Sequence, residues 1–103
     1  MKIEKIGGGT MDIFETENVK LLVKAMAVLE TEEECRAFIE DIMTSKEILD
    51  VSQRMMVAKL LDEKLVYNKI MERSGASTTT ISRVNRCYSY GSGGYRTVLD
   101  RLK

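Results

Sequence analysis

Hydrophobic residues recur at helical spacing along most of the chain, and this pattern predicts an all-α fold with six helices. The segment from Asn18 to Glu30 is apolar on most of its sides, so a helix there needs cover on more than one face. A second subunit could supply that cover in so short a chain. A central helix in a monomeric bundle is the alternative.

Two capping boxes predict where the next helices begin. Each has a threonine followed three residues later by a glutamate, at Thr31–Glu34 and at Thr44–Glu47. The helix that opens at Thr44 carries a methionine-containing apolar stripe, which is typical of a core. Its members are Ile48, Val51, Met55 and Ala58.

The two ends of the chain differ in character. Residues 1–14 contain three consecutive glycines, which are costly to order, so we expect a flexible N-terminal arm there. Residues 15–103 then form the helical domain. Its last helix is expected over 95–103, where the apolar residues again follow a helical period.

A helix-turn-helix is predicted over residues 66–88, with helices at 66–74 and 78–88. Gly75 suits the left-handed residue that ends the first helix, and Ser77 is a favourable N-cap for the second. Four apolar residues are expected on the inner faces, where they would pin the two helices together. They are Ile70 and Met71 in the first helix and Ile81 and Val84 in the second.

Polar residues gather at the start and on the outer side of the second helix. They are Ser77, Thr78, Thr79, Thr80, Ser82, Arg83 and Arg86. Such a helix can enter the major groove with its N-terminal residues toward base edges, and its N-terminus attracts a phosphate. The alternative is a hairpin used only for packing. Four consecutive hydroxyl residues are poor helix formers and argue against that alternative.

Charge is distributed unevenly, although the formal net charge of the 103-residue chain is zero. Residues 1–65 hold nine Lys/Arg and fourteen Asp/Glu, whereas residues 66–103 hold seven and two. The basic half can be presented to a polyanion. A solvated surface with chance asymmetry is the alternative.

Residue types also exclude several classes of function. The chain has no histidine, and its two cysteines, Cys35 and Cys87, are far apart without CxxC spacing. We therefore expect no metal site, no cofactor and no enzymatic activity. One thiol is expected to be buried and the other partly buried. No apolar run is long enough to span a membrane, and no signal-peptide core is present, which favours a cytoplasmic protein.

The run GASTTTISRVNRCYSYGSGGY, with KLLDEKLVYNKI before it, resembles the YerC/YecD-like branch of the Trp repressor superfamily. The resemblance covers Leu21 to Leu102. It implies a bacterial transcriptional regulator that acts as a repressor. It also implies an intertwined homodimer that binds a palindromic operator in double-stranded DNA. It also implies that the two-helix unit beginning at Tyr67 reads DNA, which adds Tyr67 and Asn68 to the candidate DNA-binding residues.

In Trp repressor an amino-acid co-repressor sets the position of the reading heads. The resemblance places Thr44, Arg83 and either Gln53 or Arg54 at the corresponding effector site. Trp repressor has a glycine after the recognition-helix arginine, where the indole needs room, but this chain has Val84. A smaller amino acid such as histidine, or no effector, is therefore expected in place of tryptophan. Alternatively, Arg83 pairs with an acidic residue and packs the hairpin.

Two other classes of function stay open. One is a DNA-binding module without effector control, as in the similar domain of the replication initiator DnaA. The other is an adaptor that uses the same helix pair to bind a protein. The basic C-terminal half favours nucleic acid over protein.

Overall fold

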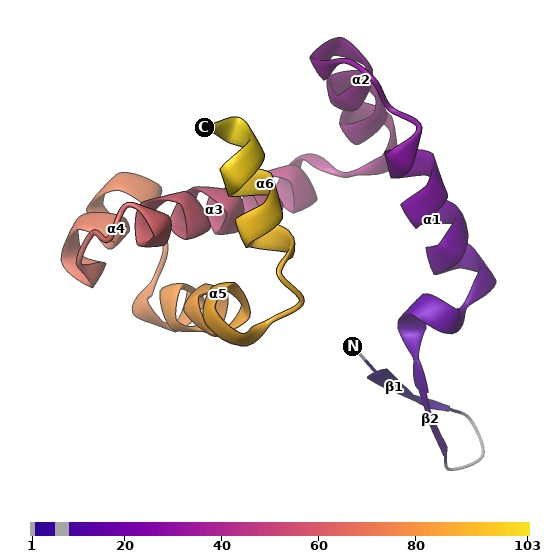
Figure 1. Ribbon diagram of the computed structural model, residues 1–103, viewed down its shortest axis with the longest axis horizontal. Helices are drawn as coiled ribbons and strands as arrows, with labels where there is room; N and C mark the ends of the chain where they lie inside the picture. The colour runs from indigo at the N-terminus through magenta and orange to yellow at the C-terminus, as the bar shows by residue number, and fades with distance from the viewer. Residues whose placement is uncertain (1, 6–8) are drawn as a thin grey trace. The chain divides into compact units, whose positions relative to one another are not determined.

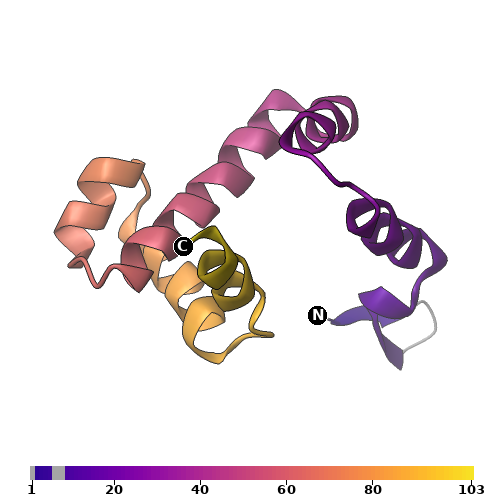
Figure 2. The same ribbon diagram turned by 45° about the horizontal axis from the view of Figure 1, so that its top comes forward.

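The computed structural model describes the backbone of residues 2–5 and 9–103, and the side chains from Asp12 onward (Figures 1 and 2). Six α-helices follow one another in this part of the chain, which confirms the predicted all-α class. They are α1 (Glu17–Ala27), α2 (Glu32–Ile42), α3 (Ser45–Asp62), α4 (Tyr67–Ser74), α5 (Thr78–Tyr90) and α6 (Gly94–Leu102).

A short hairpin precedes the helices, in the segment that the glycine run predicts to be a flexible arm. Strands β1 (Lys2–Lys5) and β2 (Gly9–Asp12) pair antiparallel, with Lys2 opposite Asp12. A 3-10 helix, η1 (Ile13–Glu15), leads from β2 into α1. The hydrophobic pattern does not predict this strand pairing. The flexibility of the arm stays a prediction.

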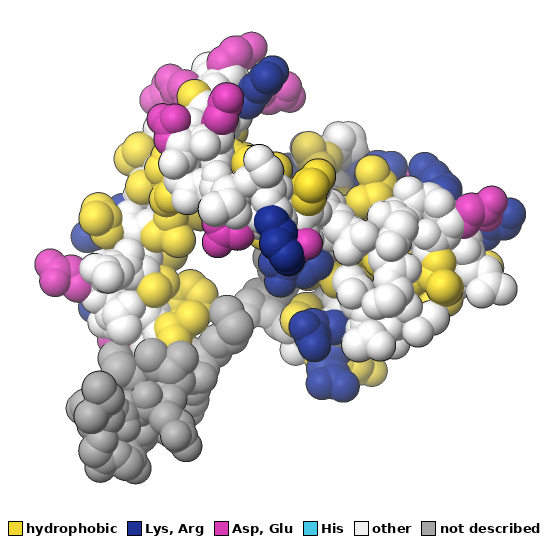
Figure 3. All heavy atoms as spheres, turned by 180° about the vertical axis from the view of Figure 1, so that it is seen from behind, with side chains coloured by type: hydrophobic (Ala, Val, Ile, Leu, Met, Phe, Trp, Pro, Cys, Tyr) yellow, Lys and Arg dark blue, Asp and Glu magenta, His cyan; other side chains and the backbone are white. Residues whose placement is uncertain are grey.

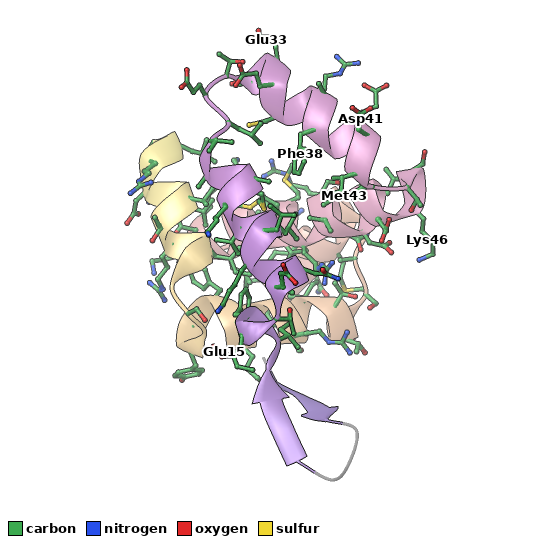
Figure 4. All side chains as sticks on the ribbon, turned by 90° about the vertical axis from the view of Figure 1, so that its right-hand side faces the viewer. Glu15, Glu33, Phe38, Asp41, Met43 and Lys46 are labelled. Carbon is green, nitrogen blue, oxygen red and sulfur yellow. The ribbon has the colours of Figure 1, made fainter. Side chains whose placement is uncertain are left out.

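The chain forms two compact units, Met1–Ile42 and Met43–Lys103. The first contains α1 and α2, and neither helix has a buried side chain. Figure 3 shows acidic side chains gathered on α2 and hydrophobic ones on the surface of α1. Figure 4 shows Glu33 and Asp41 pointing outward from α2, while Phe38 lies on another side of that helix.

The two predicted capping boxes differ in how completely they form. At α3 both reciprocal bonds are present, because Thr44 accepts from the Glu47 amide and Glu47 accepts from the Thr44 amide. At α2 the Thr31 hydroxyl accepts from the Glu34 amide at 3.1 Å. The Glu34 carboxylate instead accepts from the amide of Glu30, at 2.8 Å. Each box still caps a helix N-terminus, a contribution of about 1 kcal/mol.

The second unit holds the hydrophobic core, which α3, α4, α5 and α6 build together. The buried side chains are Val57, Ala58, Leu60, Ile70, Ala76, Ile81, Val84 and Leu99. Only the C-terminal half of α3 contributes to it. The predicted stripe is therefore core at Ala58 and partly at Met55, but Val51 is exposed.

Two predictions about individual side chains are wrong for the single chain. Met71 is expected on the inner face of α4, but it is 37% exposed whereas its neighbour Ile70 is 0% exposed. One turn of a short helix presents only one of two adjacent residues to the core. Both cysteines are exposed, because α2 buries nothing and Cys87 lies off the buried side of α5. No helix in the part described is long and apolar enough to cross a membrane.

Candidate nucleic-acid interface

The helix-turn-helix has the turn that the sequence predicts. The α4 helix ends at Gly75, whose φ of 75° is left-handed, and the Gly75 amide donates to the Met71 carbonyl. A residue with a side chain pays a steric cost in that conformation, which glycine avoids. After the turn, Ala76 is buried in the core. The turn is therefore anchored to the domain and does not project as a free loop.

Hydrogen bonds from two elements hold the turn in place. The Ser74 hydroxyl donates to the Ile70 carbonyl and accepts from the Ala76 amide. Gln53, on α3, donates its side-chain amide to the Ser74 carbonyl at 3.2 Å. The last turn of a helix leaves carbonyls without intrahelical partners, and Gln53 satisfies one of them.

The start of α5 is capped as predicted. The Ser77 hydroxyl accepts from the Thr80 amide at 3.2 Å and lies within the same distance of the Thr80 hydroxyl. Two members of the hydroxyl run thus shape the helix N-terminus. Ile81 and Val84 face the core and orient the rest of the helix, which confirms their predicted inner position.

The outer face of α5 forms a polar hollow of about 400 Å³. It brings together five of the residues that the sequence singles out, and they are Thr78, Thr79, Ser82, Arg83 and Arg86. No acidic side chain lines it. Arg83 and Arg86 have no ion pair within the described part of the chain, so their guanidinium groups are available to a ligand. This is a surface suited to phosphate oxygens and base edges.

Two predicted residues on α4 lie apart from this hollow. The Tyr67 hydroxyl accepts from the Asn85 side-chain amide at 3.2 Å, and the half-buried ring packs against the core. Asn68 is exposed on the first turn of α4. Tyr67 therefore has a structural partner already. Asn85, which the sequence pattern does not single out, fixes α5 to the start of α4.

A second hollow, of about 210 Å³, lies between α3 and α5. Its lining includes three of the predicted effector residues, and the full set is Asp50, Gln53, Arg54, Thr80, Arg83 and Val84. Thr44 is absent from this lining, and its hydroxyl caps α3. Hydrogen bonds from Thr44 keep the pKa of Glu47 below its ordinary value. Both Gln53 and Arg54 face the hollow, but Gln53 is engaged with Ser74.

A cluster of polar side chains connects α6 to the helix-turn-helix. The Tyr88 hydroxyl donates to Asp62 at 2.6 Å, and Lys103 pairs with the same carboxylate at 3.1 Å. The hydrogen bond from Tyr88 is the main cause of a lowered Asp62 pKa, and the same bond raises the pKa of Tyr88. Arg96 lies over the Tyr88 ring, 4.3 Å from its centroid. These contacts connect α3, α5 and α6 around one side of the core.

The second unit carries an excess of positive charge. Residues 43–103 hold eleven Lys/Arg and six Asp/Glu. Lys and Arg side chains are visible on the surface of this unit in Figure 3. Several of the acidic groups are paired, including Asp50 with Lys46 and Glu63 with Lys59. The unit that contains the helix-turn-helix therefore attracts anions.

A family profile, a related sequence and two solved structures all resemble this chain. The sequence profile described as "Trp repressor protein" matches residues 17–103. YerC of Bacillus subtilis (strain 168) is 41% identical over 103 residues, which cover 100% of this chain and 91% of YerC. The crystal structure of a TrpR-like protein from Eubacterium eligens superposes with a TM-score of 0.81 at 47% identity, covering 86% of this chain and 92% of that one. A structure from Staphylococcus aureus, assigned provisionally as a Trp repressor, has a TM-score of 0.80 at 39% identity and covers 89% and 95%.

Proposed function

Because this chain belongs to the Trp repressor protein family, we propose that it is a transcriptional regulator that binds a specific sequence in duplex DNA. The observation that carries the proposal is the polar hollow on the outer face of α5. It combines short hydroxyl side chains with two arginines that have no acidic partner in the described part of the chain. A regulator of this kind acts on DNA in the cytoplasm.

The hollow divides into two kinds of contact. Thr79 and Ser82 are short, exposed and near the N-terminal end of α5, so they suit base edges. Arg86 lies one to two turns further along and suits a phosphate. Base contacts give sequence preference, whereas phosphate contacts give affinity for any duplex.

We also propose that the regulator is a homodimer. Large apolar side chains are exposed in the single chain, including Leu21 at 67%, Val28 at 72% and Leu49 at 68%. In addition, α1 and α2 have no buried residue, and exposed apolar surface of this kind marks sites of protein–protein association. A second copy of the chain is the partner that family membership suggests. A two-fold dimer would read a palindromic operator.

The repressor role and the effector are the finer parts of the proposal. The hollow between α3 and α5 has the arginines that would hold a carboxylate, and Val84 narrows it. We propose an amino acid smaller than tryptophan as the effector. The second candidate function is a DNA-binding module without effector control, similar to the DnaA domain. A protein-binding adaptor is the third, and the basic second unit disfavours it.

Selection of bound duplexes from random sequence tests the proposed function directly. We expect a palindromic consensus, bound by the full chain more tightly than a scrambled duplex in fluorescence anisotropy. Thr79→Ala should weaken the consensus by about 1–3 kcal/mol while sparing scrambled DNA. Arg86→Ala should weaken both and reduce the salt slope by about one phosphate. Recovery of no consensus, or equal effects of both variants on both duplexes, would contradict the assignment.

A further inference from the structure

The lining of the polar hollow on the outer face of α5 limits which bases it can distinguish. In the major groove, asparagine and glutamine recognise adenine through hydrogen bonds, and aspartate and glutamate recognise cytosine. None of these four residue types is among the described residues that line the hollow, which are two threonines, one serine and two arginines. A preference for one base must therefore come from the arginines or from the short side chains.

The two arginines have other uses. Arg86 is proposed above to bind a phosphate, because it lies furthest from the N-terminal end of α5. Arg83 also lines the hollow between α3 and α5, beside Gln53 and Arg54, so its guanidinium group is shared between two surfaces. The three short side chains line the outer hollow alone. They are the groups left to distinguish one base from another.

The γ-methyl group of threonine is the part of these short side chains that can select a base. A hydroxyl group both donates and accepts a hydrogen bond, so it suits either kind of base edge. Thr78 and Thr79 each carry a γ-methyl group, which Ser82 lacks. A methyl group makes apolar contact with the C5-methyl group of thymine, which no other unmodified base of DNA carries. The lining of the hollow is therefore suited to thymine.

Thr78 and Thr79 are placed to make this contact. They are the first two residues of α5, both are exposed, and neither side chain forms a hydrogen bond within the described part of the chain. Thr80 differs, because it is half-buried and its amide and hydroxyl lie against the Ser77 cap. The N-terminal residues of a recognition helix are those that approach base edges. The run of four hydroxyl residues thus consists of a capping pair and a pair that is free to meet DNA.

We infer that the methyl groups of Thr78 and Thr79 select thymine in the operator by contact with its C5-methyl group. The inference rests on the proposed function and adds which base the helix selects. Burying one methyl group away from water raises affinity about fourfold, so the loss of one contact should weaken binding by about that factor. The hydroxyl groups add affinity without this preference for a base.

The experiment replaces thymine by uracil in the selected duplex, one conserved position at a time in both half-sites. Uracil pairs as thymine does but lacks the C5-methyl group. We expect fluorescence anisotropy to show binding about fourfold weaker per half-site for at least one position. A second arm places cytosine or 5-methylcytosine at that position, with guanine opposite. The methylated duplex should bind more tightly than the unmethylated one by a similar factor, because the methyl group is restored at the same place.

Matched variants locate the effect on the protein. The double variant Thr78→Ser/Thr79→Ser keeps both hydroxyl groups and removes both methyl groups, so its affinities for the thymine and uracil duplexes should become equal. Thr78→Val/Thr79→Val keeps a methyl group at each position and should retain the wild-type ratio of affinities. Ser82→Ala removes a hydroxyl group from the same hollow and should also retain that ratio. Because each ratio is taken within one variant, a change in overall affinity cancels.

The outcomes separate this inference from the proposed function. A consensus without a conserved thymine, or one in which uracil binds as tightly as thymine at every position, overturns the inference while specific DNA binding stands. A ratio that is unchanged in the serine double variant places the methyl contact on another residue and also overturns it. If selection yields no consensus, the proposed function fails and the inference fails with it.

Discussion

Gln53 on α3 donates its side-chain amide to the main-chain carbonyl of Ser74, across 21 residues of sequence. This bond ties the long helix of the core to the C-terminal end of α4, next to the turn at Gly75 and Ala76. The ideal Cβ position at Gly75 lies 3.7 Å from the same amide nitrogen, an ordinary contact distance. Gln53, which lines the hollow between α3 and α5, therefore also holds the turn of the helix-turn-helix in place.

Replacing Gln53 by Glu keeps the size of the side chain but removes the donor. We expect a loss of about 0.5–1.5 kcal/mol in the free energy of unfolding, because a part-buried hydrogen bond is lost. Urea denaturation of the two proteins measures this change. Ser52→Ala on the same helix removes only a local bond to Leu49 and should stay within about 0.5 kcal/mol of wild type. Equal stability of Gln53→Glu and wild type would contradict the structural role.

Gly75→Ala tests the turn itself. The φ of 75° is unfavourable for alanine, so we expect a cost of about 1–2 kcal/mol and weaker DNA binding. Crowding contributes little, because the nearest atom lies at an ordinary contact distance. Gly94→Ala is the matched control, since nothing lies within 4 Å of its added Cβ and its φ is not positive. That variant should be neutral or up to about 1 kcal/mol more stable in the same denaturation assay.

Local rules account for what the sequence predicts well. Thr44, Gly75 and Ser77 mark helix ends because capping depends on a few neighbouring residues. Helical periodicity likewise identifies Ile81 and Val84 as the inner face of α5. The same periodicity predicts the five residues of the polar hollow on the outer face of α5, because residues away from the buried face lie together on the opposite face of the helix.

Contacts between distant elements are what the sequence could not predict. The bonds of Gln53 to Ser74 and of Tyr88 to Asp62 join residues 21 and 26 positions apart. These bonds depend on how α3 packs against α4 and α5, and no local sequence pattern encodes that packing. Met71 illustrates the same limit, because its neighbour Ile70 takes the core position and only packing distinguishes the two.

Stability should depend on pH through Tyr88 and Asp62. The folded-state pKa of Asp62 lies below its ordinary value of 3.8, chiefly because Tyr88 donates to the carboxylate. Its contribution is therefore present above that ordinary value and is lost as pH falls through the lower folded pKa. The pKa of Tyr88 is raised above 10.0, so the bond is also lost in strong alkali. The stability difference between wild type and Tyr88→Phe, from denaturant titrations, should be largest near neutrality and shrink toward both extremes.

A parallel series with Tyr90→Phe is the control for Tyr88→Phe. Tyr90 is exposed, and its hydroxyl has no hydrogen bond in the described part of the chain. Removing that hydroxyl should change stability little at any pH. A Tyr88→Phe difference that stays constant from acid to neutral pH would show that the Asp62 bond does not contribute.

The oligomeric state is the prediction on which a palindromic operator depends. Sedimentation equilibrium at about micromolar concentration should give twice the chain mass of 11.7 kDa. Leu21→Asp places a charge on the exposed apolar surface of α1 and should shift the protein toward monomer. Lys24→Asp changes charge more, but at a polar position of the same helix, and should leave the association unchanged. A monomeric wild type would remove the expectation of a palindrome.

The response to tryptophan depends on Val84, which lines the hollow between α3 and α5 and is only 2% exposed. A β-branched side chain on a helix has one dominant rotamer, so it cannot move aside for an indole. Inserting the ring would overpack the site at a cost of about 1–3 kcal/mol, a tenfold to hundredfold loss of affinity. Isothermal titration should therefore show weak or no tryptophan binding to the wild type.

Two variants test whether Val84 is the obstacle. Val84→Gly opens the most space, but it also removes a core side chain and adds about 1 kcal/mol of helix cost. Val84→Ala removes less of the core and keeps helix propensity, so it serves where the glycine variant unfolds. We expect tryptophan affinity to rise by about tenfold or more in whichever variant stays folded by circular dichroism. Tight binding to the wild type would show instead that the indole enters by a route that Val84 does not block.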